Sequence, residues 1–200
     1  MPLILEAALA EFAQQGYGGA SMASVAARVG VTKSLIYHYF SSKEDLFRAT
    51  ARSYIQPAHS VAERTMTEGA ATALDLMRSL FEVGYDQIGK PGPHHQLMKM
   101  IITEADRFPE LAQLYREEIM VPATAILRRV LQNGVASGEF RQEVTNLPFI
   151  EEILIAPVMM TNIWRLIMNE GEAPAPNGML TTHLSLLKLA ISRKPSDTEL

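Results

Sequence analysis

The chain reads GVTKSLIYHYFSSKEDL over residues 30–46. Gly30 suits a tight turn, because glycine tolerates a positive φ angle. Thr32 can cap a short helix that runs from Lys33 to about Phe40. Such a helix carries hydroxyls, a cation, aromatic rings and an imidazole, which cannot all pack inward. This mixture of side chains suits the phosphates and base edges of DNA.

The residues just before this stretch complete a helix-turn-helix unit. Ser21 can cap a helix over residues 22–29, and Gly30 ends that helix. The small Ala26 falls where the two helices must cross closely, and Ile36 falls where it can fill the core between them. The second helix then projects outward, where it can enter a major groove.

Helical spacing dominates the whole chain, so we expect an all-α fold. An apolar stripe over residues 4–12 predicts a first helix that stops at Gly16. Ser41 and Glu44 are spaced as a capping box, which predicts that a long helix begins at about Lys43 and runs to Glu68. Breaks rich in proline and glycine separate further helices at about 70–89, 94–107, 109–136, 147–169 and 177–193.

Composition excludes several classes of protein. The 200 residues include no cysteine, which excludes a disulfide scaffold, a thiolate zinc site and a cysteine nucleophile. The net charge of −4 argues against a general binder of polyanions. Neither a signal peptide nor a membrane span is visible, so we expect a cytoplasmic protein without membrane contact. We find no catalytic constellation, and we expect no enzyme activity, no cofactor and no metal site.

Residues 30–46 resemble the signature of the TetR family of bacterial transcriptional repressors, and residues 4–17 match that family's first helix. The resemblance implies an N-terminal three-helix DNA-binding domain, 1–47, and a larger C-terminal helical domain for ligand binding and dimerisation, 48–200. It also implies a homodimer that binds double-stranded operator DNA. The residues that it places at the DNA are Ser21, Thr32, Lys33, Ser34, Leu35, Tyr37, His38, Tyr39 and Lys43.

Two features of this segment depart from the family pattern. Leu35 lies where members often carry a small or hydroxylated residue, so it either touches a thymine methyl group or packs inward. Residues 1–50 carry as many acidic as basic side chains. The sequence starts almost inside the first helix, so the basic segment that members often carry there is either missing from it or lacking in this member. We therefore expect modest non-specific DNA affinity and a shallow salt dependence.

Methionine and aromatic side chains are frequent in the second part of the chain. Methionine adapts to apolar ligands of several shapes, although each of these side chains could equally be plain core. The resemblance implies a cavity for a small, largely apolar effector among the central helices. The candidate lining residues are Met77, Phe81, Tyr85, Met98, Ile101, Met160 and Trp164.

The last two long helices are apolar on more than one face, so they need cover on more than one side. The resemblance implies that a symmetric four-helix dimer contact supplies this cover. The candidate interface residues are Leu154, Val158, Leu180, Leu184, Leu187 and Ile191. A two-fold dimer would place its two recognition helices about one DNA turn, roughly 34–36 Å, apart.

Pro57 falls inside the predicted long helix after Lys43 and would bend it. The bend either couples ligand binding to the spacing of the two recognition helices or serves packing alone.

These features together predict a ligand-responsive DNA-binding regulator, a repressor that a small apolar effector releases from a palindromic operator. One alternative is a regulator that answers to a protein partner or acts as an activator, and the absence of a cavity would favour it. Another is a helical small-molecule-binding protein or enzyme with a vestigial DNA-binding head, and turnover of a bound compound would favour that one.

Overall fold

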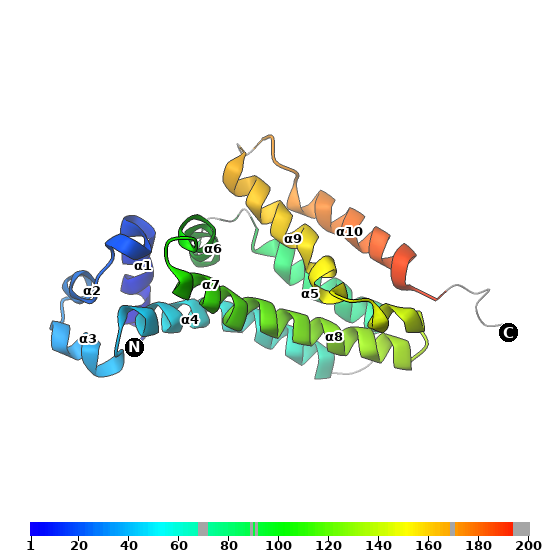
Figure 1. The fold of residues 1–200 in the computed structure, drawn as a ribbon, viewed down its shortest axis with the longest axis horizontal. Helices are drawn as coiled ribbons and strands as arrows, with labels where there is room; N and C mark the ends of the chain where they lie inside the picture. The colour runs from blue at the N-terminus through cyan, green and yellow to red at the C-terminus, as the bar shows by residue number, and fades with distance from the viewer. Residues whose placement is uncertain (68–71, 89, 91, 169–170, 194–200) are drawn as a thin grey trace. The chain divides into compact units, whose positions relative to one another are not determined.

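The structure is a computed structural model, and its secondary structure is helical, which confirms the predicted all-α fold (Figure 1). It describes residues 1–67, 72–88, 90, 92–168 and 171–193. The side chains of residues 56–67 lie outside this description. None of the described helices is long and apolar enough to cross a bilayer.

Contacts divide the chain into two compact units. Unit 1 comprises residues 1–58 and 91–121, and unit 2 comprises residues 59–90 and 122–200. This grouping does not test the functional boundary after residue 47, which stays a prediction. The elements of unit 1 are α1 (Pro2–Gly19), α2 (Met22–Val29), α3 (Lys33–Tyr39), the first part of α4 (Lys43–Thr67), α6 (Pro93–Glu104), α7 (Pro109–Tyr115) and the π-helical turn η1 (Arg116–Met120).

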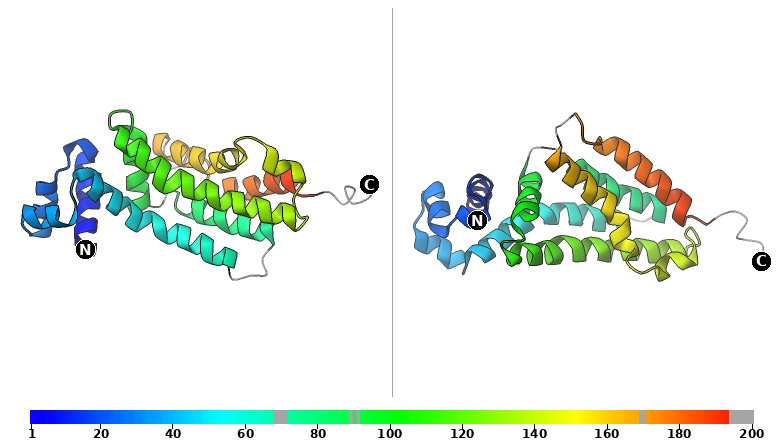
Figure 2. Two further views of the ribbon diagram at one scale, coloured as in Figure 1. Left: turned by 60° about the horizontal axis from the view of Figure 1, so that its bottom comes forward. Right: turned by 45° about the horizontal axis from the view of Figure 1, so that its top comes forward.

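Unit 2 is built from helices that share one apolar core. α10 packs against both α5 and α9 (Figure 2). The helix predicted over 109–136 is interrupted, because the π-helical turn η1 separates α7 from α8. The elements of unit 2 that follow the end of α4 are α5 (Ala73–Asp86), α8 (Val121–Ala136), the 3-10 turn η2 (Gln142–Asn146), α9 (Ile150–Ile167) and α10 (Pro176–Ile191).

Local signals form the helix-turn-helix as predicted. The hydroxyl of Ser21 accepts the Ser24 N–H at 3.1 Å, and the hydroxyl of Thr32 accepts the Leu35 N–H at 3.3 Å. Gly30 ends α2 in the left-handed conformation, with φ 78° and ψ 30°. Ala26 and Ile36 are buried between the two helices, so the second helix is fixed through its inward face.

The cap of α4 lies one residue later than predicted. Ser42, not Ser41, accepts the N–H of Asp45, at 3.0 Å. The Ser41 hydroxyl bonds to the Asp45 carboxylate, while Glu44 pairs with Arg48. The predicted capping box of Ser41 with Glu44 is therefore wrong, because adjacent serines offer two possible caps and the helix begins one residue after the second.

Pro57 lies within α4, as predicted. Its side chain falls outside the described residues, so the role of a bend there stays a prediction.

An ion pair holds α2 against α1. The Arg28 Nε and Nη2 atoms both donate to Glu11 Oε2, at 3.1 and 2.7 Å, and Nη2 also donates to Gln14. Glu11 is buried, and its hydrogen bonds with Arg28 hold the pKa of its carboxyl below the usual value. A buried carboxylate with a two-point contact fixes the angle between these helices more firmly than a surface pair would.

We predict that Gly30→Ala lowers the free energy of unfolding by about 1 kcal/mol, because a Cβ disfavours the left-handed conformation. In the described structure no atom beyond Gly30 and its two chain neighbours lies within 4 Å of an added Cβ, so the cost is one of backbone conformation. Gly30→Asn should cost less, because asparagine tolerates this region better. Urea unfolding measures both, and equal stability of Gly30→Ala and the native chain would rule out this turn.

A second prediction concerns acid sensitivity. Because folding lowers the pKa of Glu11, its stabilising effect is complete above the pKa of an unfolded glutamate, about 4.3, and is lost as the pH falls below that value. The free energy of unfolding of Glu11→Gln should therefore fall less steeply over this range than that of the native chain. Glu6→Gln, an exposed change on the same helix, should keep the native slope. An unchanged slope in Glu11→Gln would contradict the role given to the Arg28 contact.

Candidate functional site

α3 turns most of its predicted DNA contacts to solvent. Ile36 points into the core, while Leu35, Tyr37 and Tyr39 are 38%, 47% and 48% exposed. The exposure of Leu35 removes the alternative that it packs inward, so its side chain is available to a thymine methyl group. The other exposed members of the predicted set are Ser21, Thr32, Lys33, Ser34 and His38.

Two side-chain pairs organise this exposed face. The Lys33 ammonium lies 5.5 Å from the centroid of the Tyr37 ring, one helical turn further on. The His38 ring lies 5.3 Å from the Tyr39 ring, in an edge-to-face arrangement. These contacts restrict the rotamers of side chains that are otherwise in water, which would lower the entropy cost of ordering them on a ligand.

Ser21 and Thr32 of the predicted set already cap helices, and the fold also uses Lys43. Its Nζ donates to the carbonyl oxygen of Tyr17 at 2.8 Å and lies 4.5 Å from the centroid of that ring. An ammonium has three donors, so this contact orients the group and leaves further donors for a phosphate. Lys43 is therefore held in place at the N-terminus of α4.

Glu104, to which the sequence analysis gave no role, accepts a hydrogen bond from the backbone of Tyr17. α1 breaks at Gly16, where φ is 71° and ψ is 171°. Glu104 then accepts the N–H of Tyr17 at 3.1 Å and that of Gly18 at 3.2 Å. A Cβ on Gly16 would lie 2.7 Å from this carboxylate, so the close approach requires glycine. The predicted end of the first helix at Gly16 was the available signal, because the N–H groups that follow such a break need an acceptor.

Two further cations on α4 are paired with carboxylates of the π-helical turn η1. Arg48 Nη1 donates to Glu117 at 2.6 Å. Arg52 donates two hydrogen bonds of 2.7 Å to Glu118, and these hydrogen bonds lower the pKa of that carboxyl. Both guanidiniums therefore already bind carboxylates of unit 1. On α3 itself, the exposed cation is Lys33.

The predicted effector residues separate into several environments. Met77, Phe81 and Tyr85 meet in the core of unit 2. Ile101 belongs to the core of unit 1, and Met98, on the same helix, is also buried. Trp164 is half-buried, and Met160 is 42% exposed, contrary to the prediction that it faces an interior. α9 turns Leu154 and Thr161 inward, and this helical phase directs Met160 outward.

In unit 2, the predicted effector residues Phe81 and Tyr85 lie at a buried polar contact. The Tyr85 hydroxyl and His183 Nδ1 lie 3.2 Å apart, and the Phe81 and His183 ring centroids are separated by 4.5 Å. Thr161 is buried beside them on α9, and its hydroxyl donates to the Pro157 carbonyl. Burial lowers the pKa of His183, so its imidazole is neutral at neutral pH.

The predicted dimer residues face the core of their own unit. Leu154, Leu187 and Ile191 are buried there, and Val158, Leu180 and Leu184 pack against them. Burial leaves Leu154, Leu187 and Ile191 little surface to offer a partner, and the interface of these six residues stays a prediction. Both helices are apolar on more than one side, so the sequence alone could not tell the inner face from the outer one. The exposed large apolar residues are Ile153, Met160 and Ile167 on α9 and Leu186 and Leu189 on α10.

Two family models match the chain. The model described as "Bacterial regulatory proteins, tetR family" matches residues 4–50, which contain most of α1 and all of α2 and α3. The model described as "Tetracyclin repressor-like, C-terminal domain" matches residues 77–175.

Curated relatives and solved structures agree with these matches. The chain is 32% identical over 147 residues to the HTH-type transcriptional repressor AcnR of Corynebacterium diphtheriae, an alignment that covers 70% of this chain and 68% of that protein. It is 25% identical over 142 residues to the HTH-type transcriptional repressor KstR2 of Mycobacterium tuberculosis, with 70% and 69% covered. A putative regulator from Saccharomonospora viridis, solved in complex with choline, shares the fold with a TM-score of 0.73 at 20% identity, covering 96% of this chain and 97% of that one.

The exposed cation of α3 gives a prediction about salt. Lys33→Met should weaken binding to the DNA that precedes the gene and reduce the slope of log K against log [salt] by about 1, because one phosphate contact is lost. Lys99→Met, at an exposed position on α6, is the matched control and should leave both unchanged. Fluorescence anisotropy at several salt concentrations measures both quantities, and an unchanged slope in Lys33→Met would remove Lys33 from the DNA contact.

Proposed function

Since the chain belongs to the TetR family of bacterial regulatory proteins, and is therefore a DNA-binding regulator, we propose that it is a repressor which a small, largely apolar effector releases from a palindromic operator. The observation that carries the proposal is the outward face of α3. Its aromatic, hydroxyl and cationic side chains are exposed, while Ile36 alone anchors the helix in the core. Such a face has donors and acceptors for base edges and an apolar group for thymine.

The proposed operator symmetry rests on a homodimer. Ile153, Met160 and Ile167 recur every seven residues along α9, so they share one exposed face of that helix. Leu186 and Leu189 add exposed apolar area on α10. A second copy of the chain would cover these side chains, because apolar patches on helices of soluble proteins are typical of interfaces. A two-fold dimer reads two half-sites, which is why the operator would be palindromic.

The proposed effector site is the polar contact inside unit 2. Tyr85 and neutral His183 lie among Phe81, Met77 and other apolar side chains. A pocket lined by apolar groups with a few fixed polar ones is the usual environment for a small ligand. The effector would release DNA only if it binds the DNA-free conformation more tightly than the DNA-bound one.

Fluorescence anisotropy with the DNA upstream of the gene, beside a scrambled fragment, tests this proposal. We expect specific binding that Tyr37→Ala abolishes. We also expect a small, largely apolar compound to reverse it, with a fatty acid as the first probe and choline, a quaternary ammonium cation, as a polar comparison. Specific binding that no small compound reverses would favour a protein partner or an activator. Absence of specific binding at low salt, together with turnover of a compound, would favour the enzyme alternative.

The dimer face yields its own prediction. Ile153→Asp combined with Ile167→Asp should convert the dimer to a monomer of half the mass, because two desolvated carboxylates at the interface cost several kcal/mol. Ile102→Asp, at an exposed apolar position on α6, is the control and should leave the mass unchanged. Light scattering after size exclusion measures the mass, and an intact dimer in the double variant would place the interface elsewhere.

A further inference from the structure

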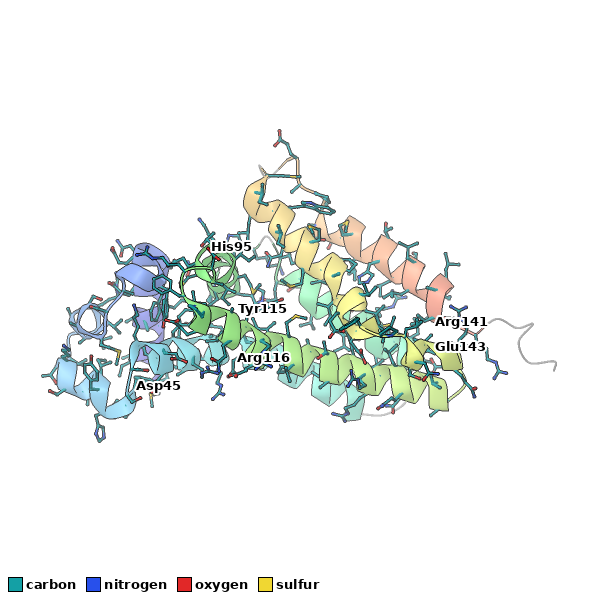
Figure 3. The ribbon with its side chains drawn as sticks, in the orientation of Figure 1. Asp45, His95, Tyr115, Arg116, Arg141 and Glu143 are labelled. Carbon is teal, nitrogen blue, oxygen red and sulfur yellow. The ribbon has the colours of Figure 1, made fainter. Side chains whose placement is uncertain are left out.

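A hollow of about 430 Å³ lies in unit 2, where α8 and α10 end. Neither the proposed DNA contacts nor the proposed effector contacts belong to it. Figure 3 labels Arg141 and Glu143, which lie in the link between α8 and α9, beside the end of α10. The hollow is lined by Val135, Gly138, Phe140, Arg141, Gln142, Glu143 and Arg193.

A short backbone pairing fixes the position of both arginines. Phe140 and Ser192 form an antiparallel bridge. The Arg141 N–H donates to the Ile191 carbonyl at 3.0 Å, and the Arg193 N–H donates to the Glu139 carbonyl at 2.9 Å. Residues next to a bridged pair leave on the side opposite to it, so the two arginine side chains start from the same side.

Two of the lining residues, Phe140 and Arg141, are also held firmly. Phe140 is 2% exposed, and its N–H donates to the Gly134 carbonyl at 2.9 Å. The Arg141 guanidinium donates to the Ala190 carbonyl in the last turn of α10. Because a guanidinium has five N–H donors, this bond orients Arg141 and leaves donors for a ligand.

The local charge differs in sign from that of the whole chain. Two guanidiniums and one carboxylate, that of Glu143, give the lining a net positive charge, while the chain carries −4. Guanidinium groups match the geometry of carboxylate and phosphate oxygens. The volume falls in the lower part of the range for small-molecule pockets, about 300–1,000 Å³, so a small ligand fits better than a macromolecule.

We propose that this hollow binds a small molecule with an oxyanion group, a carboxylate or a phosphate. Arg141 and Arg193 bind the oxyanion, and the apolar part of the molecule lies against Val135. Bound there, the ligand ties the end of α10 to the link between α8 and α9, so it stabilises unit 2 by mass action. The proposal does not depend on the repressor function.

Thermal unfolding of the full chain tests the site, with sodium phosphate and sodium hexanoate as separate probes and sodium chloride holding the ionic strength constant. We expect a saturable rise of the melting temperature with at least one probe. The probe that saturates at the lower concentration identifies the oxyanion as phosphate or carboxylate. No saturable rise with either probe would overturn the proposal.

Variants that should weaken or strengthen ligand binding test whether the rise of the melting temperature comes from this hollow. Arg141→Gln and Arg193→Gln should each need about tenfold more ligand for half-saturation, because a charge-assisted contact is lost. Glu143→Gln should need about threefold less, because a like charge is removed from the ligand's surroundings. Arg129→Gln, an exposed change on α8 of the same unit, should behave as the native chain.

The Glu143→Gln arm keeps the test decisive if Arg141→Gln fails to fold after losing its bond to Ala190. Saturation in Arg141→Gln and Arg193→Gln equal to that in Arg129→Gln would overturn the proposal. Weaker binding in Glu143→Gln would do the same.

Discussion

The position of the recognition helix depends on how the chain is held where α1 breaks at Gly16. Backbone groups released from a helix inside a protein need new partners. Glu104 accepts the N–H groups that follow the break, and Lys43 donates to the carbonyl of Tyr17. The Tyr17 ring packs against Phe47 of α4, so α1, α4 and α6 meet at a single residue. The ion pair between Glu11 and Arg28 then fixes the position of α2 against α1. The buried Ile36 fixes the position of α3 in the same core.

This arrangement has a consequence for DNA recognition. Of the cations in and after the helix-turn-helix, Arg28, Arg48 and Arg52 bind carboxylates of unit 1. The exposed face of α3 therefore carries little net positive charge, and its rings, hydroxyls and Leu35 dominate. Contacts to phosphates supply affinity without reading sequence, whereas contacts to base edges supply specificity. This composition of the exposed face suits base edges better than phosphates.

Sequence reasoning succeeded where the signal is local and failed where it is not. The Thr32 cap, the left-handed Gly30 and the buried Ile36 each follow from residues a few positions away. Glu104 is separated by 87 residues from Tyr17, whose N–H it accepts. The residues around Glu104 in the sequence do not predict that contact. The sequence could not distinguish the inner face of α9 from its outer face, because both are apolar and the packing of α10 and α5 decides which one is buried.

The central claim is that two copies of α3 read successive turns of one face of an operator. Hydroxyl-radical footprinting of the upstream DNA tests it most directly, because it records each protected sugar along the duplex. The account predicts two protected segments related by two-fold symmetry, with centres about one helical turn, roughly 10 base pairs, or a multiple of it apart. A single protected segment, or protection without symmetry, would contradict it.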